Sequence, residues 1–203
     1  SQGRRGTCSV FATVEAIEYE LAKQTGKGER LSVEFANWAA NEATGRRDDG
    51  DFFHNIHSGI DKHGVCPEEA MPYARRFRPD VAPSEDAKQK AQQFRDRVKI
   101  EFHWIRKWSK TPGMTDEDVQ QIKAALAAGH CVSAGSYHSV LFVGYEEDAS
   151  LPGGGRFFIA DSNRRETEIN FEAAKQRFTD LFWVSASVAA ESDTTPTDAP
   201  APN

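Results

Sequence analysis

The sequence predicts an α+β fold with two lobes, a helical lobe over about residues 1–98 and a β-rich, antiparallel, barrel-like lobe over about residues 99–190. Two observations predict it. Apolar residues recur at helical spacing in the first half of the chain, whereas the second half holds short apolar runs separated by turn residues. Helices and an antiparallel sheet that are segregated along a chain are typical of this class. With 203 residues and only three Cys, the chain can bury a core without a disulfide framework.

The first half contains four stretches with helical spacing. Thr7 is the expected N-cap of the first helix and Gly26 its expected stop. The four predicted helices cover, in order, residues 8–23, a stretch that begins after Ser32, residues 51–63, and residues 84–98.

The second half begins with a capping box at Thr115 and Asp118, which predicts a fifth helix that ends near Gly129. Short apolar runs bounded by turn signals then predict antiparallel strands, two of them joined by a hairpin at residues 152–155. The predicted strands cover residues 131–134, 140–145, 157–160 and 181–184.

Composition excludes several classes of protein. Lys and Arg number 25 and Asp and Glu 31, and this net charge of -6 argues against a nucleic-acid partner. No apolar run approaches the ~20 residues that cross a bilayer, so no membrane partner is expected. The chain opens without Met or a leader and looks processed or trimmed. We expect a monomer, favour a secreted or periplasmic location, and expect residues 191–203 to be a disordered tail.

Cys8 stands in the first turn of the first predicted helix. The positive end of a helix dipole favours an anion, which suits a thiolate nucleophile. Such a nucleophile needs a base or an imidazolium partner. By itself the placement is weak evidence, because a Cys in a helix is more often a buried apolar side chain.

His138 precedes one predicted strand and Asp161 follows the next one. If these strands pair across the hairpin, Asp161 lies beside His138. A carboxylate that holds an imidazole, which in turn faces a thiol, has the geometry of a catalytic triad.

These motifs resemble those of the papain-like cysteine peptidases, and the chain is similar to a divergent, bacterial-type member. The resemblance rests on Gln2, the Gly-Thr-Cys8 turn, the run from His138 to Tyr145, and Asp161-Ser162. His138 lies 130 positions after Cys8, within the ~130–150 expected for this family. The resemblance implies the two-lobed papain-like fold.

The resemblance also implies a role for each residue. Cys8 would be the nucleophile, His138 its imidazolium partner and the acid for the leaving amine, and Asp161 would orient His138. The Gln2 amide and the Cys8 N–H would form the oxyanion hole. The substrate would be a peptide or protein, a pro-segment or a protein inhibitor could also bind, and no cofactor is expected.

The substrate groove is implied by residues 50–53. Gly50 and Asp51 would hydrogen-bond an extended substrate backbone. Phe52 and Phe53 would line the pocket for the second side chain before the scissile bond and favour apolar or aromatic groups there.

The chain departs from the family pattern near these residues. Asp161 replaces the family's Asn, Ser9 and Asn163 replace two Trp, Asp51 replaces a Gly, and Arg5 replaces a Cys that is usually in a disulfide. Two alternatives to hydrolysis therefore stay open. One is acyl transfer to an amine by the same Cys-His-Asp set, and the other is a non-catalytic peptide-binding module.

Other candidate sites have simpler interpretations. Cys66 and Cys131 are expected to be structural thiols, although a disulfide between them stays open. Aromatic residues between basic ones at Phe102, Trp104 and Trp108 indicate packing between the lobes rather than nucleic-acid stacking. The run His54, His57, His63 and Cys66 fits no zinc-finger spacing, and no metal site is expected.

Overall fold

The computed structural model describes residues 1–189 of the chain, so the predicted tail at 191–203 lies outside the described residues. Four helices precede the first strand, α5 follows that strand, and α6 lies between the last two strands. The elements are α1 (Cys8–Thr25), α2 (Val33–Thr44), α3 (Phe53–His63), α4 (Glu85–Arg97), β1 (Val98–Arg106), α5 (Asp116–Ala127), β2 (Val132–Gly135), β3 (Val140–Glu147), β4 (Gly155–Ala160), β5 (Glu168–Asn170), α6 (Phe171–Arg177) and β6 (Asp180–Val188).

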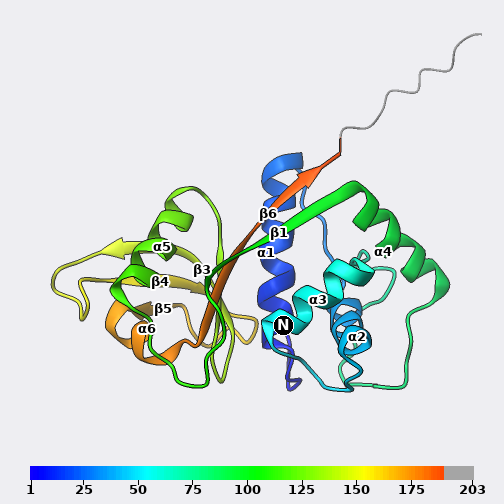
Figure 1. Cartoon of the computed structure of the whole chain (residues 1–203), viewed down its shortest axis with the longest axis horizontal. Coiled ribbons are helices and arrows are strands. Elements are labelled where there is room, and N and C mark those ends of the chain that lie inside the picture. The colour runs from blue at the N-terminus through cyan, green and yellow to red at the C-terminus, as the bar shows by residue number, and fades with distance from the viewer. Residues whose placement is uncertain (190–203) are drawn as a thin grey trace, which may run out of the picture.

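Helix α1 lies at the centre of the molecule, with α2, α3 and α4 on one side and β3, β4, β5, α5 and α6 on the other, while the long strands β1 and β6 cross α1 and reach the α4 side (Figure 1). Its apolar stripe is fully buried, as Val10 and Ile17 show. Gly26 ends the helix in the left-handed conformation, as predicted. Thr7 occupies the N-cap position, but its hydroxyl bonds the hydroxyl of Tyr73 at 2.6 Å instead of capping a backbone N–H.

The other predicted helices are present, with small shifts of their ends. Ser32 caps α2 by accepting a hydrogen bond from the N–H of Phe35. The capping box of Thr115 and Asp118 opens α5. Helix α3 begins at Phe53 rather than at residue 51, because Phe52 has an extended backbone and occupies the N-cap position.

One antiparallel sheet of six strands, in the order β1-β6-β2-β3-β4-β5, forms the second half. The predicted hairpin is present, with Glu147 of β3 opposite Gly155 of β4. The α+β class is confirmed, and the sheet is open, because its edge strands β1 and β5 do not pair with each other. Strands β1 and β5 and helix α6 were not predicted from the sequence.

Two apolar cores meet along β6. One surrounds α1 and includes Phe53 of α3 and Phe182 of β6, whose rings contact edge to face at 4.9 Å. The other fills the space between the sheet and helices α5 and α6. Within residues 1–189, no helix combines the length and apolar character that a membrane span requires.

Candidate active site

Cys8 is the first residue of α1, is half-buried, and lines a pocket of about 370 Å³. The backbone N–H groups of the first helical turn have no intrahelical partner, so this end of α1 favours negative charge. Ser136 and Ser139, which flank His138, line the same pocket. The pocket therefore brings the N-terminus of α1 against the segment that carries His138.

His138 and Asp161 lie side by side. The register of β3 and β4 sets Leu141 opposite Ala160, so the residues beyond these strand ends face each other. His138 Nε2 lies 2.7 Å from Asp161 Oδ1. With Nε2 engaged by the carboxylate, the Nδ1 atom of His138 makes no hydrogen bond to the described residues. This ring nitrogen is thus available to a second partner.

The Asp161 carboxylate is fully buried and accepts four hydrogen bonds. Burial raises its pKa, but the bonds from the N–H of Asn163, from His138 and from the N–H groups of Arg165 and Glu166 outweigh that effect and lower it overall. The carboxylate therefore stays ionised behind the imidazole, where it stabilises an imidazolium.

Gln2 is buried and fixed on both sides. Its Oε1 accepts a hydrogen bond from the Ser162 hydroxyl at 2.5 Å, and its backbone N–H donates to the Ser162 carbonyl at 3.3 Å. Its Nε2 donates to the Arg5 carbonyl at 2.7 Å, which uses one of its two hydrogens. Gln2 is thus held by the segment that follows Asp161.

Gly50 brings the segment after α2 against residues 3–7, the loop that precedes Cys8 and is called the Cys8 loop below. Its φ of 92° lies in the region that glycine favours, and a Cβ there would lie 2.0 Å from the carbonyl oxygen of Gly6. The Ser9 hydroxyl donates to the Asp51 carbonyl at 2.6 Å, and the Gly50 N–H donates to the Asn37 side chain at 2.8 Å. Residues 50–53 all line the Cys8 pocket, where the resemblance placed the substrate groove.

Arg5, in the position of the family's usual cystine, is buried and forms a network of ion pairs. Its guanidinium contacts the Glu34 carboxylate and lies 2.9 Å from Asp49 Oδ1. It also donates to the Ala74 carbonyl at 2.8 Å and lies over the ring of Tyr73, 4.6 Å from the ring centroid. These contacts join the Cys8 loop to α2 and to two neighbouring loops without a disulfide.

Two pocket residues were missed by the sequence analysis. Trp108 was expected to pack between the lobes, but 45% of its surface is exposed and it lines the Cys8 pocket. Asp180 lines the pocket too, with only 3% of its surface exposed. A carboxylate at the start of an otherwise apolar strand was the signal that could have drawn attention to Asp180.

Cys66 and Cys131 are both free and buried, so the disulfide left open by the sequence is not formed. Burial raises the pKa of each thiol to about 11. At neutral pH these two thiols carry very little thiolate, so they are poor nucleophiles.

The histidine run does not converge on one point. Each ring packs on a different aromatic side chain: His54 on Phe52, His57 on Phe102 and His63 on Trp38. Across residues 1–189 there is no group of three or more His, Cys, Asp and Glu side chains that could hold a metal ion.

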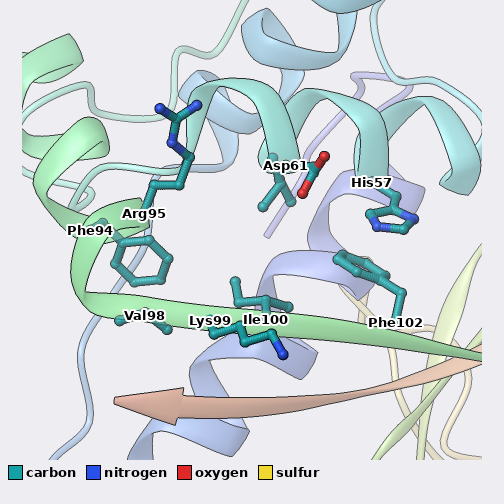
Figure 2. A pocket seen from close by; sticks show the side chains of 10 residues that line it. His57, Asp61, Phe94, Arg95, Val98, Lys99, Ile100 and Phe102 are labelled. Atoms are coloured by element: carbon teal, nitrogen blue, oxygen red, sulfur yellow. The ribbon is translucent and has the colours of Figure 1, made fainter. Parts of the chain in front are cut away.

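A second pocket, of about 160 Å³, lies between α3, α4 and β1 and shares no lining residue with the Cys8 pocket (Figure 2). The His57 ring stacks on Phe102 at 3.9 Å on one side of it, and Phe94 and Arg95 of α4 lie on the other (Figure 2). Burial lowers the pKa of His57, against the opposing effect of Asp61. None of the predicted site residues lines this pocket.

Solved structures with this fold include several cysteine proteases. Xylellain from Xylella fastidiosa is 22% identical, with a TM-score of 0.67 over 91% of this chain and 81% of that one. Digestive procathepsin L 3 from the larval midgut of Tenebrio molitor is 16% identical, with a TM-score of 0.64 over 91% and 65% of the two chains. The protease and lectin-like domains of Cwp84, a surface-layer-associated protein of Clostridium difficile, are 16% identical, with a TM-score of 0.69 over 94% and 49%.

A search among curated proteins found no match by sequence. The family model described as papain family cysteine protease matches residues 1–163. This segment includes Gln2, Cys8, His138 and Asp161, and the resemblance drawn from the sequence is confirmed. The chain belongs to the papain family of cysteine proteases.

Proposed function

We propose that this chain hydrolyses peptide bonds through Cys8 and His138. The observation that carries the proposal is the position of Cys8 at the N-terminus of α1, in a pocket shared with the residues that flank His138, while His138 is held by Asp161 at 2.7 Å. Because Asp161 occupies Nε2, the proposal assigns Nδ1 of His138 to the Cys8 thiol. Proton transfer from sulfur to Nδ1 would give the thiolate–imidazolium pair.

The reaction then takes two steps. The Cys8 sulfur attacks the carbonyl carbon, and the oxyanion accepts hydrogen bonds from the Cys8 N–H and the remaining Nε2 hydrogen of Gln2. His138 gives its proton to the amine as the C–N bond breaks, which leaves a thioester on Cys8. A water molecule then loses a proton to His138 and attacks the thioester, which releases the acid and returns the proton to the pair.

Residues 50–53 would hold the substrate. The proposal assigns backbone hydrogen bonds to Gly50 and Asp51, and places the second side chain before the scissile bond against Phe52 and Phe53, which line the pocket beside Cys8. A pro-segment is a second proposed occupant of the groove, since procathepsin L 3 is among the similar structures.

The two alternatives are not favoured. A binding module that has lost turnover would not need a buried carboxylate with four hydrogen-bond donors behind His138, nor the anchoring of Gln2 by Ser162. Acyl transfer calls for the exclusion of water, whereas the Cys8 pocket opens to solvent beside exposed Phe52 and Trp108.

Incubation with an unfolded protein substrate tests the proposal. We expect cleavage by the wild-type chain, loss of cleavage in Cys8→Ser, and cleavage in the matched control Cys66→Ser. Addition of a competing amine should leave the hydrolysed acid as the main product, and the amide as main product would favour acyl transfer. No cleavage by any form of the protein would contradict the proposal.

A further inference from the structure

The Cys8 pocket is lined by four carboxylates. The positively charged groups near them are unevenly distributed. Asp49 pairs with Arg5 at 2.9 Å, and Asp48 pairs with Arg46 at 2.5 Å. Asp48 and Asp49 are therefore neutralised by arginines of the helical half of the molecule.

Asp51 is less completely satisfied. Its side chain is 1% exposed, and its Oδ1 accepts from the N–H of Phe52 at 2.8 Å and from Asn55 at 2.9 Å. Its Oδ2 is buried without a hydrogen-bond partner, and the nearest cation, Nε of Arg46, lies 3.8 Å away and is engaged by Asp48. A buried carboxylate oxygen without a donor is costly unless a ligand supplies one.

Asp180 has no cation in contact at all among the described residues. Its Oδ1 lies 2.9 Å from the Thr179 hydroxyl. The same oxygen packs against Gly135, where an added Cβ would lie only 2.0 Å from it. Burial raises its pKa, against the opposing effects of the Thr179 hydrogen bond and of the more distant His54. A cation placed beside Asp180 would relieve the cost of burying this charge.

The mouth of the same pocket is aromatic. Phe52 and Trp108 are 42% and 45% exposed, and their rings meet edge to face at 5.3 Å. Exposed aromatic faces attract cations through the ring quadrupole. The long apolar stem of a Lys or Arg side chain suits aromatic walls, and its charged end suits a carboxylate floor.

From these observations we infer that the pocket beside Cys8 binds a basic side chain of the substrate, with Asp180 as its charge partner and Phe52 and Trp108 as its walls. The inference rests on the proposed function, in which this pocket takes the second side chain before the scissile bond. It replaces the expectation, drawn from Phe52 and Phe53 alone, that the pocket favours apolar or aromatic groups.

Binding to the Cys8→Ala chain tests the inference without turnover. Three peptides would be compared that are identical except for lysine, N-acetyl-lysine or norleucine at the second position before the bond. By calorimetry at about pH 7.5, we expect the lysine peptide to bind at least about tenfold more tightly than the other two. Equal affinities, or no measurable binding, would overturn the inference.

Variants then assign the preference to its residues. Asp180→Asn should reduce the ratio of lysine to norleucine affinity to about one, since it removes the charge. Asp96→Asn, which removes one charge from the exposed face of α4, should keep the ratio. Asp180 is buried, so Trp108→Leu at an exposed position serves as a second variant and should lower the ratio about threefold. A ratio unchanged in both Asp180→Asn and Trp108→Leu would overturn the inference.

The two proposals fail in different ways. A lysine preference in the Cys8→Ala chain together with no cleavage by the wild-type chain would overturn the proposed hydrolysis and leave the basic-side-chain pocket standing. Cleavage of the norleucine and lysine peptides at equal rates, with equal affinities, would overturn the basic-side-chain pocket and leave the proposed hydrolysis standing.

Discussion

Ser162 holds Gln2 through two hydrogen bonds, one from its hydroxyl to the Gln2 Oε1 at 2.5 Å and one between the two backbones at 3.3 Å. Ser162 directly follows Asp161, so the segment that orients His138 also positions the proposed oxyanion donor. The two functions are therefore coupled through one short stretch of chain after β4.

This coupling predicts the effect of Ser162→Ala. Loss of the hydroxyl frees the Gln2 amide to rotate, so we expect kcat for peptide cleavage to fall about tenfold with little change in KM, because the oxyanion forms only as the reaction proceeds. Ser150→Ala, which removes a hydroxyl from an exposed turn, should leave kcat unchanged. A rise in KM with kcat unaltered would show that Gln2 contributes to substrate binding instead.

Asp161→Asn is expected to change how stability depends on pH. The pKa of Asp161 is lowered in the folded state, so its ionised form contributes stability that is complete above the unfolded-state pKa and is lost as the pH falls through the folded pKa. The difference in unfolding free energy between wild type and Asp161→Asn, measured in urea, should therefore shrink as the pH is lowered from about 5 toward 2. A difference that does not vary with pH would contradict this account of the buried carboxylate.

The sequence predicted much of the fold because its local signals were strong. Apolar spacing and capping residues located α1, α2 and α5, and the Gly-rich turn at residues 152–155 located the hairpin that joins His138 to Asp161. Strand β1 was missed although its apolar and polar residues alternate from Val98 to Trp104, the pattern of a half-buried strand. Its partner β6 lies about 80 residues away in sequence, so no neighbouring run indicated the pairing.

The site was predictable only in part, for a related reason. Cys8, His138 and Asp161 stand out because each lies at the start or end of a predicted element. Asp180 and Trp108 carry no local motif, and only the tertiary fold brings them to the Cys8 pocket. The anchoring of Gln2 by Ser162 joins residues 160 positions apart and could not be read from either segment alone.

Arg5→Met should lower stability strongly. It would leave the Glu34 carboxylate, buried with Arg5, without its cation, and breaking such a buried pair costs about 3–5 kcal/mol. The matched control is Arg47→Met, since Arg47 pairs with Asp80 at an exposed position and should contribute less than about 1 kcal/mol. Chemical denaturation of both variants measures the difference in unfolding free energy. Equal losses in the two variants would show that the Arg5 network does not stabilise the Cys8 loop.

Gly50→Ala tests the close approach of residues 49–51 to the Cys8 loop. An added Cβ would lie 2.0 Å from the Gly6 carbonyl oxygen at a φ of 92°, so we expect a loss of at least about 2 kcal/mol in unfolding free energy. Gly28→Ala adds the same methyl group where nothing lies within 4 Å and should change stability by no more than about 0.5 kcal/mol. If Gly50→Ala is as stable as Gly28→Ala, the tight apposition does not exist in solution.

The most direct test of the central claim is the rate at which iodoacetamide alkylates each cysteine at about pH 5.5, followed by peptide mapping. Cys66 and Cys131, whose buried thiols have pKa values raised to about 11, serve as references within the same molecule. We expect Cys8 to react at least about 100-fold faster than either, and to slow by at least about tenfold in His138→Ala. A Cys8 that reacts no faster than Cys66 and Cys131, or that reacts equally fast without His138, would contradict the proposed thiolate–imidazolium pair.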